Sequence, residues 1–297
     1  MPQLNFEAIG TVWQVSFESS RSILEVSTAV HAIITRFDQT YSRFRPDTLV
    51  RTISRAAGLF VLPDDAEPLL AFYKQLYDVT SGRVTPLIGQ LMDDTGYDAN
   101  YSFQPGALRT VPAWDDVLYY RHPILQTHQP VLFDFGAAGK GYLVDLIAKK
   151  FQKMDVFPFV INAGGDIYTD SRIQVALESP TNTDEAIGVA TIHRQAICGS
   201  SGNRRKWAQF THIIDPLTQR SPTAIAATWV VADTTMAADG IATALFFTDA
   251  AILQQTFAFE YALVAQDGGL YCSAGFPADF FITQQEEDYE HTDLLYR

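Results

Sequence analysis

Hydrophobic and polar positions follow two different periods along this chain, and these periods divide it into strands and helices. Residues Thr11–Phe17 alternate between apolar and polar side chains, which predicts a strand with one buried face. Apolar residues instead recur every three or four positions over Arg21–Phe44 and over Ala66–Val79, the spacing of amphipathic helices. The second helix is expected to stop near Gly82, because glycine commonly ends helices.

Beyond residue 156 the pattern favours short strands that are rich in β-branched residues. The expected strands are Phe157–Ile161, Ile173–Leu177, Ile187–Ile192, Gln195–Cys198, Phe210–Ile214 and Thr228–Val231. A hairpin is expected where Tyr261–Val264 and Leu270–Cys272 flank Asp267-Gly268-Gly269. Asp98–His128 has no clear period and is expected to be a flap or hairpin excursion, and Gln284–Arg297 an acidic tail or short helix.

These segments predict the fold class. Strands do not alternate regularly with helices, which argues against a doubly wound parallel sheet. We therefore expect an α+β fold with mixed or antiparallel sheets flanked by helices. At 297 residues the chain is long enough for one large domain over 1–297, or for two intimately packed subdomains.

A further helix is predicted over Thr234–Thr248, with Asp233 as its N-cap. Asp239 and Thr243 lie four residues apart, so their side chains project from one face among alanines and glycine. A carboxylate and a hydroxyl in this arrangement can hold a hard cation through oxygen ligands. The alternative interpretation is a polar stripe that faces solvent on an ordinary amphipathic helix.

A glycine-rich turn follows an apolar run at 131–135, which is predicted to be a buried strand interrupted by Asp134. Gly136, Gly139 and Gly141 then break the pattern before helical spacing begins at Tyr142 and continues to Phe151. Backbone N–H groups at such a turn, together with Lys140, can bind phosphate. Neither the Walker A pattern nor the dinucleotide GxGxxG pattern fits these glycines, and a generic glycine-rich turn is the alternative.

Composition and charge exclude several classes of function. There are 21 Lys and Arg against 34 Asp and Glu, which gives a net charge of −13 and argues against nucleic-acid binding. An anionic ligand would therefore need local positive groups, for which Lys140 and the run Arg204-Arg205-Lys206 are candidates. Cys198 and Cys272 form no metal-binding or redox motif.

The sequence also bears on location. No apolar run is long enough to span a membrane. The first residues lack a signal peptide and a lipobox cysteine, so we expect a cytoplasmic protein if Met1 is the natural start.

Six motifs in one order resemble the ApbE family of flavin transferases, and the resemblance runs from about Ile9 to Phe247. The motifs stand in this chain as Ile9-Gly10-Thr11, Tyr41–Thr48, Asp134–Asp145, Asn162–Asp166, Ser201-Gly202 followed by Thr211–Gln219, and Ala238–Thr243. The chain departs from the family pattern where Ile9 stands for methionine, Phe44 for tyrosine, Thr85 for aspartate and Gln219 for glycine. These changes fall mostly on the part of the pattern that binds the isoalloxazine ring.

The resemblance implies an ApbE-like fold with an active site in the cleft between two subdomains. It implies Mg²⁺-dependent transfer of FMN from FAD to a Thr or Ser hydroxyl of an acceptor flavoprotein, with release of AMP. The implied metal ligands are Ala137, Asp239 and Thr243. Lys140 and His212 are the implied catalytic residues. The implied flavin-binding residues are Ile9, Phe44, Arg83, Val84, Thr85, Asp134, Lys140, Gly164, Gly165, Asp166, Ser201 and His212.

Some of these residues also have ordinary structural interpretations. A histidine such as His212 in a strand is commonly structural, and Asp166 can cap a turn. Asp134 within an apolar run is harder to explain, because a buried carboxylate is costly unless a partner satisfies it. Asp215 is expected to hold the turn at Pro216.

The same sequence features are also compatible with two other functions. One is hydrolysis of FAD to FMN and AMP with water as acceptor, and the other is FAD binding without catalysis.

Overall fold

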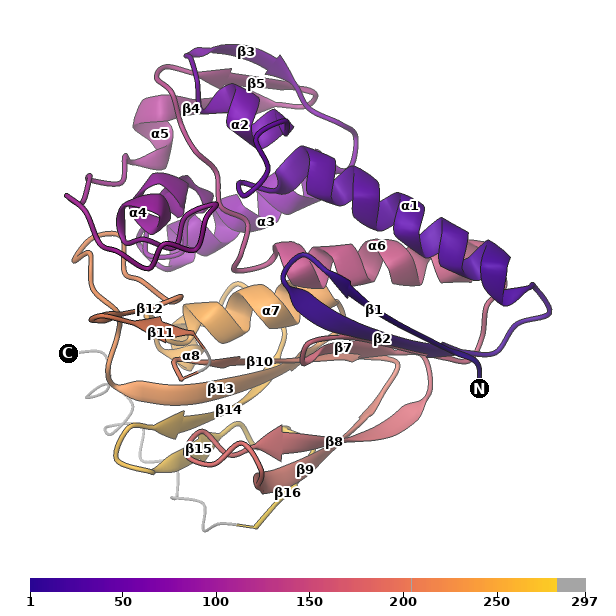
Figure 1. The fold of residues 1–297 in the computed structure, drawn as a ribbon. Helices are drawn as coiled ribbons and strands as arrows, with labels where there is room; N and C mark the ends of the chain where they lie inside the picture. The colour runs from indigo at the N-terminus through magenta and orange to yellow at the C-terminus, as the bar shows by residue number, and fades with distance from the viewer. Residues whose placement is uncertain (204, 282–297) are drawn as a thin grey trace. The chain divides into compact units, whose positions relative to one another are not determined.

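The computed structural model describes residues 1–203 and 205–281, and its chain divides into two compact units. The first unit comprises 1–34, 140–204 and 223–297, and the second comprises 35–139 and 205–222. Figure 1 shows the helices and strands along the chain.

An eight-stranded antiparallel sheet forms the centre of the first unit, in the order β1-β2-β6-β7-β10-β13-β14-β15. Its strands are β1 (Gln3–Ala8), β2 (Thr11–Phe17), β6 (Phe159–Ala163), β7 (Asp166–Thr169), β10 (Ala196–Ser201), β13 (Ile225–Ala232), β14 (Glu260–Ala265) and β15 (Leu270–Cys272). β13 is buried along its whole length, as a central strand covered on both faces should be.

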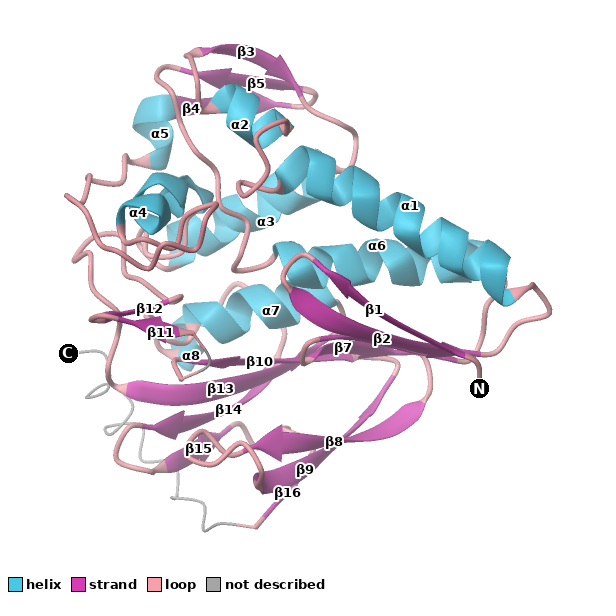
Figure 2. Cartoon of the chain, viewed as in Figure 1, coloured by secondary structure: helices cyan, strands magenta, loops and turns pink. Residues whose placement is uncertain are grey.

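Two helices cover one face of this sheet, and a small sheet covers part of the other (Figure 2). The helices are α6 (Gly139–Lys153) and α7 (Thr235–Ala244), and the small antiparallel sheet has the order β16-β9-β8. Its strands are β8 (Arg172–Glu178), β9 (Ala186–His193) and β16 (Ala278–Phe280). Leu177 and Ile192 of the small sheet share one apolar core with Ile197, Trp229 and Val264 of the large sheet. The short helix α8 (Ala250–Leu253) also belongs to this unit.

The second unit contains helices, two small sheets and a long irregular segment. Its helices are α2 (Leu49–Ile53), α3 (Ala66–Val79), the 3₁₀ turn η1 (Pro86–Ile88), α4 (Gly89–Asp94), α5 (Trp114–Val117) and the later part of α1 (Ile23–Tyr41). One sheet has the order β3-β5-β4, and the other pairs β11 with β12. Those strands are β3 (Gly58–Val61), β4 (Leu118–Arg121), β5 (Ile124–Thr127), β11 (Lys206–Trp207) and β12 (Phe210–Thr211). Leu91, Tyr97, Trp207 and Phe210 form part of its apolar core.

Most elements predicted from the pattern are confirmed. β2 and α3 have the predicted bounds, and the hairpin around Asp267 is formed by β14 and β15. All strand pairs of the large sheet are antiparallel, which confirms the α+β expectation. The segment Asp98–His128 was predicted to be irregular. Its later part contains the regular elements α5, β4 and β5, whereas the part before residue 114 has no helix or strand.

Three expectations were wrong. Residues 131–135 are mostly buried but form no strand. Among residues 1–203 and 205–281, the backbone bond from this run to another segment is that of Asp134, which donates its N–H to the carbonyl of Pro86. The strand expected at Phe210–Ile214 ends at Thr211. Gly139 and Gly141, expected to lie in a turn before the helix, instead belong to the first turn of α6, which begins at Gly139. The predicted tail at 284–297 lies outside the described residues, and no described helix is both long and apolar enough to cross a bilayer.

Candidate functional site

Helix α7 carries the predicted cation ligands of the first unit, and its start differs from the expectation. Thr234, rather than Asp233, is the N-cap, because the Thr234 hydroxyl accepts the N–H of Ala237 at 3.2 Å. Asp239 is only 5% exposed, and Thr243 one turn later is half-buried. The two side chains therefore do not form a polar stripe that faces solvent.

A buried carboxylate needs partners, and α6 supplies them to Asp239. The backbone N–H of Gly141 donates to Asp239 Oδ2 at 2.9 Å, and Lys140 Nζ lies 3.9 Å from Asp239 Oδ1. Burial raises the pKa of Asp239, while the Lys140 ammonium and the Gly141 hydrogen bond act in the opposite direction. Gly141 permits this close approach, since a Cβ at this position would meet the Thr235 carbonyl and Asp239 Cβ.

Lys140 forms an ion pair with Asp166, which is 2% exposed. Asp166 is the first residue of β7 rather than the cap of a turn. Two carboxylates and one ammonium leave one negative charge in excess, and the Lys140 side chain keeps 27% of its surface exposed. The cluster can therefore hold a cation and present an ammonium to an anionic ligand at the same time.

Asp145 completes this group of charges, although the sequence analysis did not select it. Its carboxylate accepts the N–H groups of Thr235 and Met236 at 2.8 and 2.9 Å, and so holds the first turn of α7 against α6. Burial raises the pKa of Asp145 from its ordinary 3.8 to about 6, against the effect of these two hydrogen bonds. The available signal was its spacing of four residues from Gly141, which places both residues on one face of α6.

The turn between β6 and β7 presents Gly164 and Gly165, both with positive φ, beside Thr11 of β2. Gly164 is required there, because a Cβ would collide with the Thr11 hydroxyl. Ile9, at the turn between β1 and β2, also has a positive φ of 44°, which is unusual for a β-branched residue. Ser201, at the end of β10, accepts the N–H of Asn203 through its hydroxyl at 3.3 Å.

In the second unit, Asp134 is not a lone carboxylate. It pairs with Arg43 and accepts the N–H of Gly136 at 2.6 Å. Arg43 is 2% exposed and also pairs with Asp93 at 2.7 Å, and Asp93 in turn accepts from Arg51. Arg43 could not be selected from the sequence, because nothing in the local pattern shows that residue 43 reaches residue 134.

Phe44 belongs to an aromatic cluster that the sequence analysis also missed. Its ring stacks on Tyr101 with centroids 5.4 Å apart and meets the edge of Tyr97 at 5.6 Å. The Arg43 guanidinium lies 4.2 Å from the Phe44 ring centroid, and the Arg205 guanidinium donates to the Tyr97 hydroxyl at 2.6 Å. Flat rings and guanidinium groups together form a surface on which an aromatic ligand can stack.

The remaining predicted residues of this unit have mostly structural partners. Arg83 pairs with Asp215 at 3.5 Å, and Val84 is buried. Thr85 caps η1, since its hydroxyl accepts the N–H of Leu87. Asp215 holds the turn at Pro216 as expected, because it accepts the N–H of Leu217 at 2.8 Å.

His212 and Ala137 also belong to the second unit. His212 follows β12 and donates its backbone N–H to the carbonyl of Arg205 at 3.2 Å. Ala137 lies in the turn before α6. The N–H of Gly141 donates to Asp239 rather than to the Ala137 carbonyl four residues earlier. Of the basic run named as a candidate, Arg204 lies outside the described residues and Lys206 is exposed.

No group of three or more His, Cys, Asp or Glu within the described ranges forms a preassembled metal cage. The oxygen donors of Asp239 and Thr243 instead fit Mg²⁺, which is commonly held by one or two carboxylates together with substrate phosphates. Cys198 is buried against α7, where its S–H donates to the Thr235 carbonyl, and burial raises the pKa of its thiol well above the usual value.

Comparison with known proteins gives one consistent result. The model of the ApbE family matches residues 9–261. An FAD:protein FMN transferase of Haemophilus influenzae is 25% identical over 280 residues, which are 82% of this chain and 79% of that protein. A second one, from Rhodobacter capsulatus, is 24% identical over 56% of this chain and 35% of its own length.

The solved structures agree in fold. The flavin transferase ApbE from Vibrio cholerae superposes with a TM-score of 0.77 at 20% identity, covering 93% of this chain and 97% of that one. The ApbE protein from Thermotoga maritima gives a TM-score of 0.77 at 18% identity, covering 92% of this chain and 97% of that one.

Proposed function

The chain belongs to the ApbE family and is a flavin transferase, and from that premise we propose that it moves FMN from FAD to a Thr or Ser hydroxyl of an acceptor flavoprotein. The reaction depends on Mg²⁺ and releases AMP.

The observation that carries this proposal is the buried cluster of Lys140, Asp166 and Asp239. Its members come from three elements that are far apart in the sequence: the start of α6, the start of β7 and the middle of α7. The single ammonium of Lys140 offsets only one of the two buried carboxylates, and a bound cation would compensate the other. A divalent cation and a pyrophosphate together match the carboxylates and the ammonium.

Asp239 and Thr243 would hold the magnesium ion, with the Ala137 carbonyl as a third ligand on the strength of the family resemblance. When bound, the ion supplies positive charge that neutralises the pyrophosphate. Two observations support this assignment. The Asp239 carboxylate is buried, and the N–H of Gly141 donates to Asp239 and not to the Ala137 carbonyl.

The protein's own groups supply the rest of the chemistry. The acceptor oxygen attacks the phosphorus of the FMN half, so that a new P–O bond forms and the bond to the bridging pyrophosphate oxygen breaks. AMP leaves with that oxygen, and His212 takes the proton of the acceptor hydroxyl. Lys140, freed in part from Asp166, stabilises the charge on the phosphoryl oxygens.

The flavin-binding residues are proposed from the resemblance and from their positions. In the first unit they are Ile9, Lys140, Gly164, Gly165, Asp166 and Ser201. In the second unit they are Phe44, Arg83, Val84, Thr85, Asp134 and His212. The aromatic cluster of Phe44, Tyr97 and Tyr101 supports stacking of a ring in the second unit. Phe44 keeps the aromatic face that a stacking role needs, although it lacks the tyrosine hydroxyl.

The fate of FAD with and without Mg²⁺ tests this function. With Mg²⁺ and acceptor, chromatography should show loss of FAD and appearance of AMP, and chelation should stop both. Free FMN with every acceptor supplied would indicate hydrolysis instead. FAD that is bound but stays intact would indicate a carrier.

A further inference from the structure

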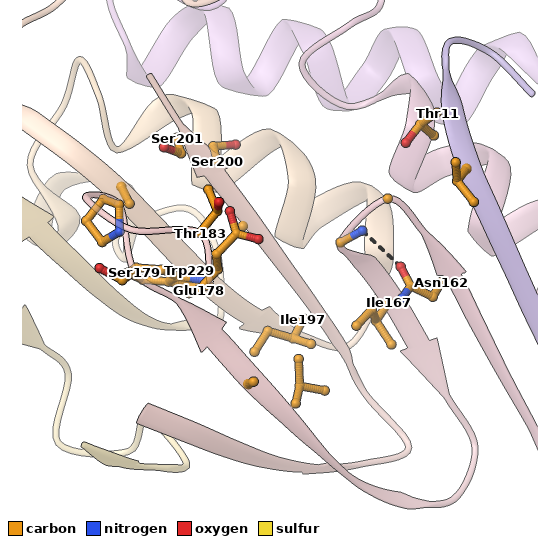
Figure 3. Close-up of a pocket in the computed structure, with 18 of the residues that line it drawn as sticks. Thr11, Asn162, Ile167, Glu178, Ser179, Thr183, Ile197, Ser200, Ser201 and Trp229 are labelled. Atoms are coloured by element: carbon orange, nitrogen blue, oxygen red, sulfur yellow. Dashed lines mark hydrogen bonds between the residues drawn. The ribbon is translucent and has the colours of Figure 1, made fainter. Parts of the chain in front are cut away.

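A groove of about 660 Å³ lies in the first unit, on the face of the large sheet opposite α7 (Figure 3). Its floor is formed by Gln14 of β2, Asn162 of β6 and Ile197 of β10. Ile197 and its neighbour Cys198 point to opposite faces of β10, and Cys198 donates its S–H to the Thr235 carbonyl of α7. The groove therefore lies across the sheet from the buried charges of α6 and α7.

One wall of the groove is an edge strand. β8 is the outer strand of the order β16-β9-β8 and pairs only with β9 among residues 1–203 and 205–281. Val175, Ala176 and Glu178 of β8 line the groove. An edge strand presents backbone N–H and C=O groups to which an extended peptide can add as a further strand.

The chemistry of the lining does not suit a polyanion such as a pyrophosphate. Glu178 is the single charged side chain among the described lining residues, and none of those residues is a lysine or an arginine. The other polar groups are neutral amides and hydroxyls, such as those of Asn5, Asn162 and Ser200. A pyrophosphate would find no counter-charge here, whereas a neutral or basic polypeptide matches the surface.

The groove also adjoins the proposed reaction site. Gly164, Gly165 and Ser201 line it, and all three are among the proposed flavin-binding residues. Gly165 directly precedes Asp166, the partner of Lys140. A segment in the groove would therefore reach the β6–β7 turn, beside the residues proposed to bind the phosphates.

We propose that this groove binds the acceptor protein, whose hydroxyl-bearing segment lies extended along β8 as an added strand. The proposal rests on the proposed transfer reaction and adds to it the place where the acceptor is recognised. The acceptor segment is neutral or basic in charge, and its hydroxyl loses a proton and gains the phosphoryl group of FMN as AMP leaves.

Two matched substitutions test the groove. Gln14→Trp fills the floor from an exposed position, and Gln126→Trp makes the same change at an exposed position of β5 in the second unit, outside the groove. The probe is a mixture of short peptides with a central threonine between randomised flanks. Gln14→Trp should raise the KM for peptide by about tenfold or more and change FAD affinity by less than about twofold, while Gln126→Trp changes neither.

Hydrogen exchange provides a second measurement that does not need turnover. The peptide mixture should slow the exchange of backbone amides within 172–178, because an added strand hydrogen-bonds them, and FAD alone should not. This separates the two proposals, since the protection is expected even if no FMN is transferred.

Three results would overturn the inference. Weaker FAD binding in Gln14→Trp would show that the groove is part of the nucleotide site. Equal effects of the two substitutions would show no specific role for the groove. Unchanged exchange at 172–178 in the presence of peptides would show that β8 accepts no strand, whatever happens to FAD.

Discussion

Asp239 is the residue on which the proposed metal site depends most. Asp239→Ala removes the charged oxygen donor, so activity should fall by more than about a hundredfold. The fold should survive, because the ionised carboxylate is itself costly to bury. Thr243→Val keeps the side-chain volume and loses one oxygen, and should raise the Mg²⁺ concentration needed for half-maximal rate without abolishing turnover.

Magnesium titrations of the two variants and of Asp233→Ala check this prediction. Asp233 is exposed and precedes the helix, so its removal should leave the metal requirement unchanged. An unchanged requirement in the Asp239 and Thr243 variants as well would remove α7 from the active site.

Asp145 gives a prediction about pH and stability. Its pKa rises from 3.8 in the unfolded chain to about 6 in the folded one, so the folded protein binds the proton more tightly. The resulting stabilisation is present below pH 3.8 and is lost as pH rises through 6, by about 3 kcal/mol in total.

Asp145→Asn isolates this contribution, because asparagine does not titrate. Denaturant unfolding at a series of pH values gives the free energy of unfolding of both proteins. The value for wild type minus that for the variant should fall between pH 4 and 6.5. A difference that stays constant or rises over this range would show that burial does not raise the Asp145 pKa.

At the residue scale, the sequence predicted the chemical groups better than their partners. Asp239, Lys140 and Asp166 were selected from their motifs, and the structure brings these three together. Arg43 and Asp145 were missed because each is hydrogen-bonded to a residue 90 or more positions away, Arg43 to Asp134 and Asp145 to Thr235. Local spacing contains no information about such pairs.

At the scale of elements, the contact between α6 and α7 sets the geometry of the cluster. Gly141→Ala would place a Cβ 2.8 Å from Asp239 Cβ and against the Thr235 carbonyl, so the helices must separate. The expected cost is about 1–3 kcal/mol of unfolding free energy, with a loss of activity. Gly106→Ala is the control, since its Cβ would meet only the Asp94 carbonyl at 3.8 Å. Equal unfolding midpoints for the two variants would contradict this account.

The Arg43 network should stabilise the second unit. Arg43→Ala leaves Asp134 and Asp93 short of a buried partner and should cost about 3–5 kcal/mol. Arg45→Ala removes an exposed ion pair two residues later and should leave the free energy of unfolding nearly unchanged, because solvent screens such pairs. Chemical denaturation of both variants makes the comparison, and similar losses would show that the buried pairs contribute little.

Elements with a strong period were predicted well, and those that depend on partners were not. β2 and α3 have clear periods and the predicted bounds. The run at 131–135 is apolar enough for a strand, but within the described part of the chain it pairs with no neighbouring strand. The cap of α7 was misplaced by one residue because Asp233 and Thr234 are both good N-caps, and only the backbone geometry decides between them.

At the scale of the whole molecule, the class of fold followed from the sequence but its strand order did not. The absence of strand–helix alternation indicated an α+β fold with mixed or antiparallel sheets, and the strand pairs of the large sheet are antiparallel. The order β7-β10-β13 joins strands that are separated by long excursions, and no local signal encodes those pairings. The same pairings create the groove beside β8, which no sequence motif indicated.

The most direct test of the central claim is the mass of the acceptor after incubation with FAD and Mg²⁺. Intact-mass spectrometry of the threonine peptides should show a covalent gain of one FMN, located on the hydroxyl residue by fragmentation. AMP should form in equal amount, and chelation of Mg²⁺ should abolish both. Unmodified peptides together with intact FAD, at saturating Mg²⁺, would contradict the account.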